Sequence, residues 1–204
     1  MAETTYNRQM LYNTLVHIYT ESNPNPHSMK FMLNFMLMAE GVSLDFPDVA
    51  STYQKSPLAQ ALFEAFPFVK RVFMANNFIT ITKTEEKEWI EIISQLKSFI
   101  KEYIEAKKPI FAESLPDQQV VVEQDNEVVK KIKLVLEEYI RPAVETDGGA
   151  IQFVSFDQEK GMLTVQLQGS CSGCPSSTVT LKAGIENLMK RMVPQVKEVV
   201  SEAI

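Results

Sequence analysis

Hydrophobic and polar positions are most regular in residues 163–192, LTVQLQGSCSGCPSSTVTLKAGIENLMKRM. The first residues alternate between apolar and polar, which predicts a half-buried strand that Gly169 and Ser170 interrupt. Pro175 lies at or near the first position of a helix, where its missing N–H costs nothing. Apolar residues then recur at helical spacing and predict one buried face, formed by Leu181, Ile185, Leu188, Met189 and Met192.

The same reading predicts the other elements of the C-terminal part. Residues 127–140 have apolar positions at helical spacing, and residues 150–156 and 162–168 read as a hairpin. A short strand is expected at 196–200. Residues 127–204 therefore have the predicted order α-β-β-α-β, a small α+β layer pair.

The N-terminal part predicts a second set of elements. A β-rich strand is followed by a proline turn, an apolar methionine-rich segment, a helix, a hairpin and a long helix. These are residues 14–20, 22–27, 29–38, 56–66, 69–75 with 78–82, and 85–108. The methionines fill a core in this interpretation, because no Cys or His stands beside them at ligand spacing.

Residues 109–126 contain two prolines and no sustained period, so we interpret them as a linker. The predicted fold class is α+β, with two small α/β-layer domains: residues 1–108, and residues 127–204 beyond the linker.

Composition and charge limit the classes of function. Hydrophobic content of 45% and charged content of 23% are ordinary for a globular protein. The net charge of −6 is divided equally between residues 1–119 and 120–204, so no basic half indicates nucleic acid. The most apolar stretch, residues 29–39, is too short to span a membrane. Two cysteines and the absence of a secretory leader favour a reducing, cytoplasmic location.

The candidate chemistry is carried by Cys171 and Cys174, both on the predicted strand-to-helix loop. A helix N-terminus stabilises thiolate over thiol, and the thiolate binds metal or attacks disulfides. A lone C-x-x-C does not separate zinc sites, redox dithiols, iron–sulfur ligands and buried cysteines.

The longer string LQGSCSGCPSSTVTLKAGIE resembles the NifU C-terminal domain of the Nfu family of iron–sulfur cluster carriers. Upstream, Arg141-Pro142 and Asp147-Gly148-Gly149 fit that family's R-P…D-G-G pattern. The residues that match around the cysteines are Leu167, Gly169, Cys171, Cys174, Pro175, Ser176, Ser177, Thr180, Leu181, Lys182, Gly184, Ile185 and Glu186.

The N-terminal part is similar to the Nfu N-terminal domain. Pro24-Asn25-Pro26, Lys30-Phe31 and the FITITK of residues 78–83 fit the family's T-P-N-P-N-x-L-K-F and F-I-T-V-T-K stretches. The chain departs from this pattern in having Asn23, His27 and Met29 where the family has Thr, Asn and Leu.

Ligand number adds a constraint. Iron–sulfur clusters and structural zinc sites commonly take four protein ligands, whereas this chain has two cysteines and no histidine near them. Two chains must therefore meet, each giving Cys171 and Cys174. The resemblance implies that they share a labile [4Fe-4S] cluster as a homodimer. It also implies an upstream cluster-assembly scaffold and apo iron–sulfur client proteins as partners, and a carrier that is not an enzyme.

The main alternative is a thiol–disulfide oxidoreductase that uses the Cys171/Cys174 dithiol. Such enzymes need a βαβ core and a proline loop facing the sulfurs. Here a hairpin precedes the motif and only Pro194 follows the helix. Ser176 and Ser177 have no base and are better explained as helix caps. His17 and His27 are expected at ordinary strand and turn positions.

Overall fold

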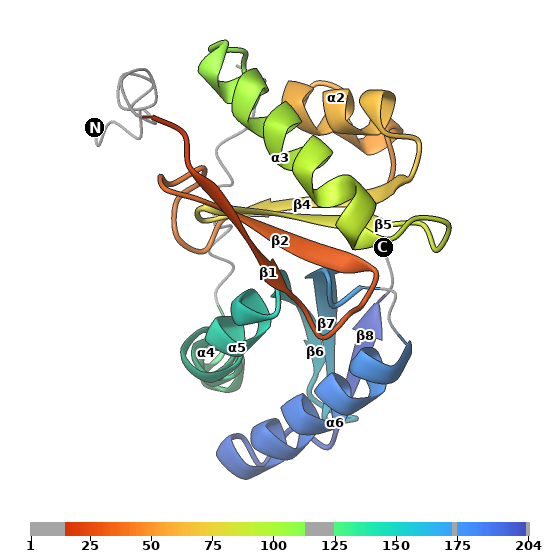
Figure 1. Ribbon diagram of the computed structural model, residues 1–204. Helices are drawn as coiled ribbons and strands as arrows, with labels where there is room; N and C mark the ends of the chain where they lie inside the picture. Colours follow the sequence, from red (N-terminus) through yellow and green to blue (C-terminus); the bar gives the residue numbers. More distant parts are fainter. Residues whose placement is uncertain (1–14, 113–124, 173–174, 203–204) are drawn as a thin grey trace, which may run out of the picture. The chain divides into compact units, whose positions relative to one another are not determined.

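The structure is a computed structural model of residues 1–204 (Figure 1). It describes residues 15–112, 125–172 and 175–202, without the side chains of residues 175–179. The chain divides into two compact units. The N-terminal unit is Met1–Ser22 with His27–Gln118, and the C-terminal unit is Asn23–Pro26 with Gln119–Ile204.

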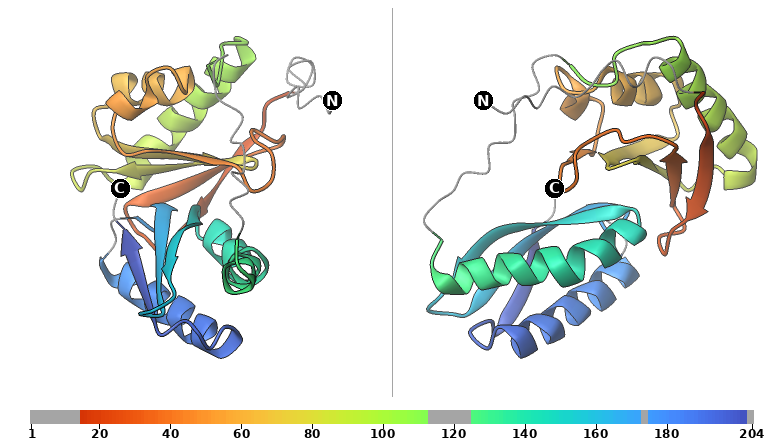
Figure 2. Two further views of the ribbon diagram at one scale, coloured as in Figure 1. Left: turned by 180° about the vertical axis from the view of Figure 1, so that it is seen from behind. Right: turned by 90° about the vertical axis from the view of Figure 1, so that its left-hand side faces the viewer.

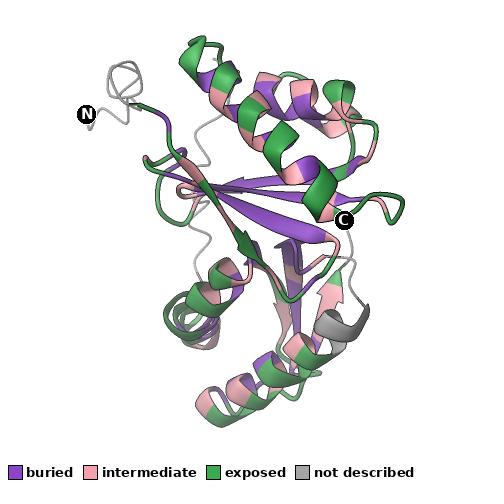
Figure 3. Cartoon of the chain, viewed as in Figure 1, coloured by how far each residue is buried: buried purple, intermediate pink, exposed green. Residues whose placement is uncertain are grey.

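A five-stranded sheet organises the N-terminal unit, in the order β1-β2-β5-β4-β3. All four strand pairings are antiparallel. Strands β2, β4 and β5 are mostly buried, whereas the edge strand β1 is not (Figure 3). Their bounds are Ile18–Ser22 for β1, Ser28–Leu33 for β2, Ser43–Phe46 for β3, Val69–Ala75 for β4 and Phe78–Lys83 for β5.

Helices α2 (Pro57–Ala65) and α3 (Trp89–Glu105) cover one face of this sheet (Figure 1). The Ser56 side chain caps α2 by accepting a hydrogen bond from the Ala59 N–H, and Pro57 follows at the first helical position. Alternate strand residues meet the apolar faces of both helices in one core, which includes Phe31, Ile79, Ile81, Leu58, Leu62, Leu96 and Ile100.

The C-terminal unit begins with a helix that continues past its predicted end. Helix α4 (Glu127–Val135) leads through a π-helical turn, η2 (Leu136–Ile140), into α5 (Arg141–Thr146). The Arg141 N–H bonds to the Leu136 carbonyl, one residue further back than in an α-helix. Pro142 has no N–H to donate, and the wider turn accommodates it without ending the helix.

A three-stranded sheet supports the cysteine loop. Strands β6 (Gly149–Asp157) and β7 (Met162–Gly169) are antiparallel, and β8 (Glu198–Glu202) pairs with β7 in parallel. Helix α6 (Pro175–Met192) makes the crossover from β7 to β8. Both helical segments pack on one face of the sheet (Figure 2). The core between them includes Ile132, Leu136, Val144, Leu163, Val165, Leu167, Ile185, Met189 and Val199.

The α+β class and the α-β-β-α-β order of the C-terminal part are confirmed. The differences are local. The first strand begins at Ile18 and the last at Glu198, each later than expected, and the short strand β3 and the 3-10 turn Ala50–Thr52 were not expected. Most of the proposed linker, residues 113–124, lies outside the described residues, so the domain boundaries stay a prediction. None of the described helices is both long and apolar enough to cross a membrane.

Glu186 ties α6 to β8. One carboxylate oxygen accepts a hydrogen bond from the Val199 N–H at 3.0 Å, and the other accepts one from Lys190 Nζ at 2.6 Å. The Lys190 hydrogen bond, followed by that of the Val199 N–H, lowers the pKa of Glu186 below its usual 4.5. The carboxylate form is therefore stabilised by folding.

Glu186 should make the free energy of unfolding fall as the pH is lowered into the acid range. Because its pKa is lower in the folded state, the carboxylate stabilises the fold above pH 4.5, and this contribution is lost as the pH falls through the folded-state pKa. Glu186→Gln should lower the free energy of unfolding at neutral pH by about 1 kcal/mol or less, and should flatten its decline in acid. Urea unfolding across pH measures both; Glu198→Gln, at an exposed position of β8, is the control and should behave as wild type.

Candidate functional site

Cys171 lies on the loop that follows β7, as the sequence predicts. Strand β7 ends at Gly169, whose φ of 64° lies in the left-handed region that glycine adopts without strain. The Ser172 N–H then donates to the Gly169 carbonyl at 3.1 Å, which closes a tight turn. The chain is thereby turned directly after the end of β7.

Ser170 fixes this loop to the segment that precedes β6. Its N–H donates to the Gly148 carbonyl at 3.3 Å, and its hydroxyl donates to the Asp147 carbonyl. Ser170 is 2% exposed. The carbonyls of Asp147 and Gly148, the first two residues of the D-G-G motif, therefore hold the residue next to Cys171.

Cys171 is buried, although its neighbours in the sequence are small and polar. Its side chain is 5% exposed and packs with the apolar cluster of the C-terminal unit. Its sulfur lies 3.8 Å from the Ser170 hydroxyl oxygen. The thiol is therefore held in place by its surroundings rather than displayed to solvent.

Gly149 leaves the space that the Cys171 sulfur occupies. A β-carbon added to Gly149 would lie 2.9 Å from that sulfur and 2.5 Å from the Gln168 carbonyl oxygen. Gly149 also pairs directly with Gly169 across β6 and β7. The second glycine of the D-G-G motif thus has a packing role that the turn alone does not require.

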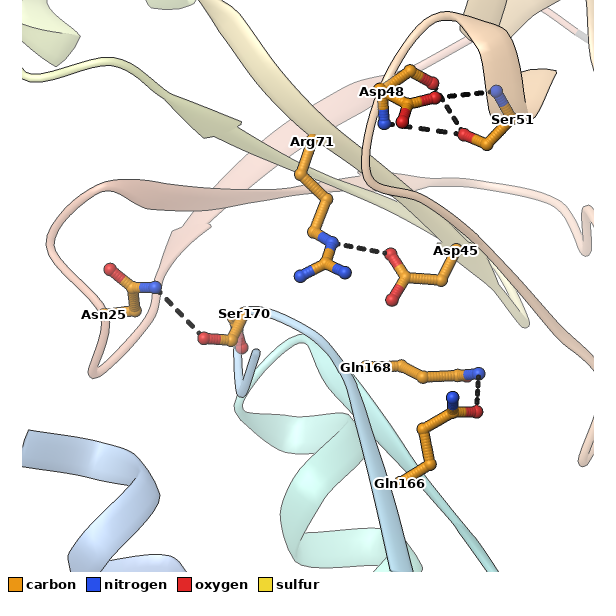
Figure 4. Close-up of polar contacts among 8 residues, drawn as sticks. All are labelled: Asn25, Asp45, Asp48, Ser51, Arg71, Gln166, Gln168 and Ser170. Atoms are coloured by element: carbon orange, nitrogen blue, oxygen red, sulfur yellow. Dashed lines mark hydrogen bonds and ion pairs between the residues drawn. The ribbon is translucent and has the colours of Figure 1, made fainter. Parts of the chain in front are cut away.

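Asn25 makes a further contact with the loop (Figure 4). Its side-chain Nδ2 donates to the Ser170 carbonyl oxygen at 3.0 Å, although the two residues are 145 positions apart. Asn25 is 5% exposed. In the sequence its only distinguishing feature is its place between two prolines, and neither periodicity nor spacing indicates the contact.

Cys174 lies outside the described residues, as do the side chains of Ser176 and Ser177. Among the residues that are described, no three His, Cys, Asp or Glu side chains lie close enough to hold a metal ion. His17 is exposed and lies just before β1 rather than within the expected strand, and His27 lies in the turn that precedes β2.

The crossover of α6 bears on the oxidoreductase alternative. Because β7 and β8 are parallel, β7, α6 and β8 form a βαβ unit with the cysteine loop at its first junction. The hairpin that precedes the motif is therefore not evidence against a βαβ unit. The remaining argument against a dithiol enzyme is that Pro194 lies just after α6, at the end of the helix away from the loop.

The packing around Cys171 predicts different effects for two glycines. Gly149→Ala should destabilise the fold by about 1–3 kcal/mol, because a neighbouring backbone carbonyl or the Cys171 sulfur must shift. Gly184→Ala is the matched control: a β-carbon there meets nothing within 4 Å, and alanine in a helix should stabilise by up to about 1 kcal/mol. Chemical denaturation of both variants tests this, and equal stabilities would contradict the close packing at Gly149.

Comparison with known proteins covers most of the chain. Residues 18–107 match the family model "Scaffold protein Nfu/NifU N terminal", and residues 132–200 match "NifU-like domain". The chain is 40% identical over 188 residues to NifU-like protein 5, mitochondrial, of Arabidopsis thaliana. It is 40% identical over 183 residues to the NFU1 iron-sulfur cluster scaffold homolog, mitochondrial, of Drosophila grimshawi.

These alignments cover 91% and 89% of this chain, which spans 67% and 60% of the two relatives. A solution structure of a NifU-like protein from Saccharomyces cerevisiae is 22% identical, with a TM-score of 0.43 over 55% of this chain and 93% of that one. One family model thus covers the N-terminal part of the chain and the other covers the C-terminal part. The chain therefore belongs to the NifU-like family of the Nfu type.

Proposed function

We propose that this protein is an iron–sulfur cluster carrier. It binds a labile [4Fe-4S] cluster between the Cys171 and Cys174 thiolates of two chains and transfers it to apo-proteins. The observation that carries the proposal is that Cys171 lies on the loop after β7, while Cys174 directly precedes in the sequence Pro175, where α6 begins. Membership of the NifU-like family and the name of the Drosophila relative, an iron-sulfur cluster scaffold homolog, support it.

Ligand number makes the proposed carrier a homodimer when it is loaded. A [4Fe-4S] cluster commonly takes four cysteine thiolates, and one chain supplies two. The N-terminus of α6 from each chain adds free N–H groups and a positive dipole end near the anionic cluster. In this proposal residues 127–204 form the cluster-binding domain, and residues 109–126 link it to the N-terminal domain.

Transfer requires exchange of ligands rather than catalysis of a reaction. Each iron–thiolate bond to the carrier is replaced by one to a client thiolate, and the cluster keeps its electrons. The carrier receives the cluster from an upstream cluster-assembly scaffold and holds it until an apo client protein takes it.

Cysteine thiols stay reduced, and so available as thiolates, in a reducing compartment. The cytoplasmic location expected from the sequence stays a prediction, and the two named relatives are mitochondrial.

The thiol–disulfide oxidoreductase stays the alternative, because the cysteine loop lies at the first junction of a βαβ unit. One experiment separates it from the proposed carrier. Anaerobic reconstitution with iron and sulfide should give the charge-transfer absorption of a cluster, with iron and sulfide bound in equal numbers. A protein that binds neither, yet reduces a disulfide substrate, would contradict the proposal and support a dithiol enzyme. Zinc bound by the same sulfurs is colourless and is distinguished by metal analysis.

Cys171→Ser and Cys174→Ser should each abolish stable cluster binding. Either change removes two of the four sulfurs of a dimer, and serine oxygen is a poor replacement for a soft thiolate. Because Cys171 is buried, its serine variant should also lose about 1–3 kcal/mol of stability. Iron and sulfide analysis after reconstitution measures binding, and circular dichroism verifies the fold.

Ser172→Ala is the control for these variants, because it alters the same loop without removing a thiol. It should retain cluster at the wild-type stoichiometry. Wild-type iron and sulfide in either cysteine variant would show that the ligands lie elsewhere in the chain.

The oligomeric state should follow the cluster. Four thiolate bonds link two loops, so loading couples to association as metal binding couples to folding in small metallo-domains. Anaerobic size-exclusion chromatography or native mass spectrometry should show a dimer after reconstitution and a monomer after chelation or transfer. A monomer with a full cluster would contradict the shared site, because one chain has only two cysteines.

A further inference from the structure

A short segment from the N-terminal sequence belongs to the C-terminal unit. Residues Asn23–Pro26, which connect β1 to β2, group with the unit that contains the cysteine loop. Pro24 and Pro26 are exposed, whereas Asn25 between them is buried at 5% exposure. The two prolines restrict the backbone on either side, so the Asn25 side chain is presented with little freedom to lose.

The contact of Asn25 completes the hydrogen bonding of Ser170. The Asn25 amide donates to the Ser170 carbonyl at 3.0 Å, while the N–H and hydroxyl of Ser170 bond to the segment before β6. The N–H, the carbonyl and the hydroxyl of Ser170 therefore all form hydrogen bonds. Cys171 is the next residue in the chain. Moving Cys171 outward therefore requires these bonds to break or to move together.

The proposed function demands such a movement. Cys171 is 5% exposed, and a cluster shared with a second chain must reach its sulfur. An incoming client thiolate must reach the same iron. The arrangement of the loop that buries Cys171 is therefore closed, and loading or transfer needs an open one.

We propose that Asn23–Pro26 is a latch on the cysteine loop, with Asn25 as the positioning residue that keeps Cys171 inaccessible. Release of the latch exposes Cys171 for cluster loading and transfer. The biological role rests on the proposed function, but the latch itself is a property of the apo chain. It can therefore be tested without iron.

The test measures how fast Cys171 reacts with iodoacetamide. In the apo full-length chain with Cys174→Ser, Cys171 is the only thiol left, because the sequence has two cysteines. Asn25→Ala and Asn25→Asp are compared in this background. Aspartate has nearly the same size as asparagine but, when ionised, donates no hydrogen bond. Each variant should raise the alkylation rate roughly threefold to tenfold. Loss of one hydrogen bond shifts the local opening equilibrium by about that factor, and the thiol reacts only when the loop is open.

Asn77→Ala is the matched control. The Asn77 amide also donates to a backbone carbonyl, that of Leu33 at 3.1 Å, within the N-terminal unit. This variant should leave the alkylation rate unchanged. Rates measured across pH separate access from acidity: greater access multiplies the rate by one factor at every pH, whereas a changed thiol pKa alters the shape of the profile.

Three results would overturn the latch. The first is a wild-type alkylation rate in Asn25→Asp, and the second is an increase in Asn77→Ala equal to that in the Asn25 variants. The third is a rate–pH profile that changes shape in the Asn25 variants instead of rising by the same factor at every pH. If Asn25→Ala fails to fold, the isosteric Asn25→Asp carries the comparison. Failure of the latch leaves cluster binding by the full-length chain untouched. Conversely, a chain that binds no cluster but shows the predicted rates has a latch and a different function.

Discussion

The backbone of residues 147–149 determines where Cys171 can lie. Two carbonyls of this segment accept hydrogen bonds from Ser170, and Gly149 provides the space beside the sulfur. Gly149 and Gly169 face each other across the first pair of β6 and β7, so the two strands begin and end at the cysteine loop. The loop is therefore held by strand pairing as much as by its own turn.

The mixed sheet gives this loop a rigid base. The antiparallel pair β6–β7 is local in sequence, whereas the parallel pair β7–β8 needs α6 as its crossover. Glu186 on α6 accepts the Val199 N–H of β8, so helix and strand are joined near the middle of the crossover. Helix α6 and β8 are therefore held together by a contact that does not involve the cysteine loop.

The sequence predicts much of this architecture because its strong patterns are local. The alternation of β7, the spacing of α6 and the position of Pro175 place the cysteine loop correctly. Strand β3 is too short for its alternation to stand out, and Pro142 suggests a helix end that a π-turn avoids. The burial of Cys171 was not predictable, since its neighbours in sequence are small and polar while the residues that enclose it come from other elements.

Burial of Cys171 also bears on chemical damage. Oxidation of a thiol to sulfenic and then sulfinic acid follows its exposure and its thiolate character. In the closed loop the Cys171 sulfur is enclosed by the C-terminal core and lies against Gly149. If the chain is the carrier proposed above, it has no cargo between deliveries to shield its ligands from peroxide. Burial in the fold would then supply that shield for Cys171 and keep this thiol in the reduced form that the next cluster requires.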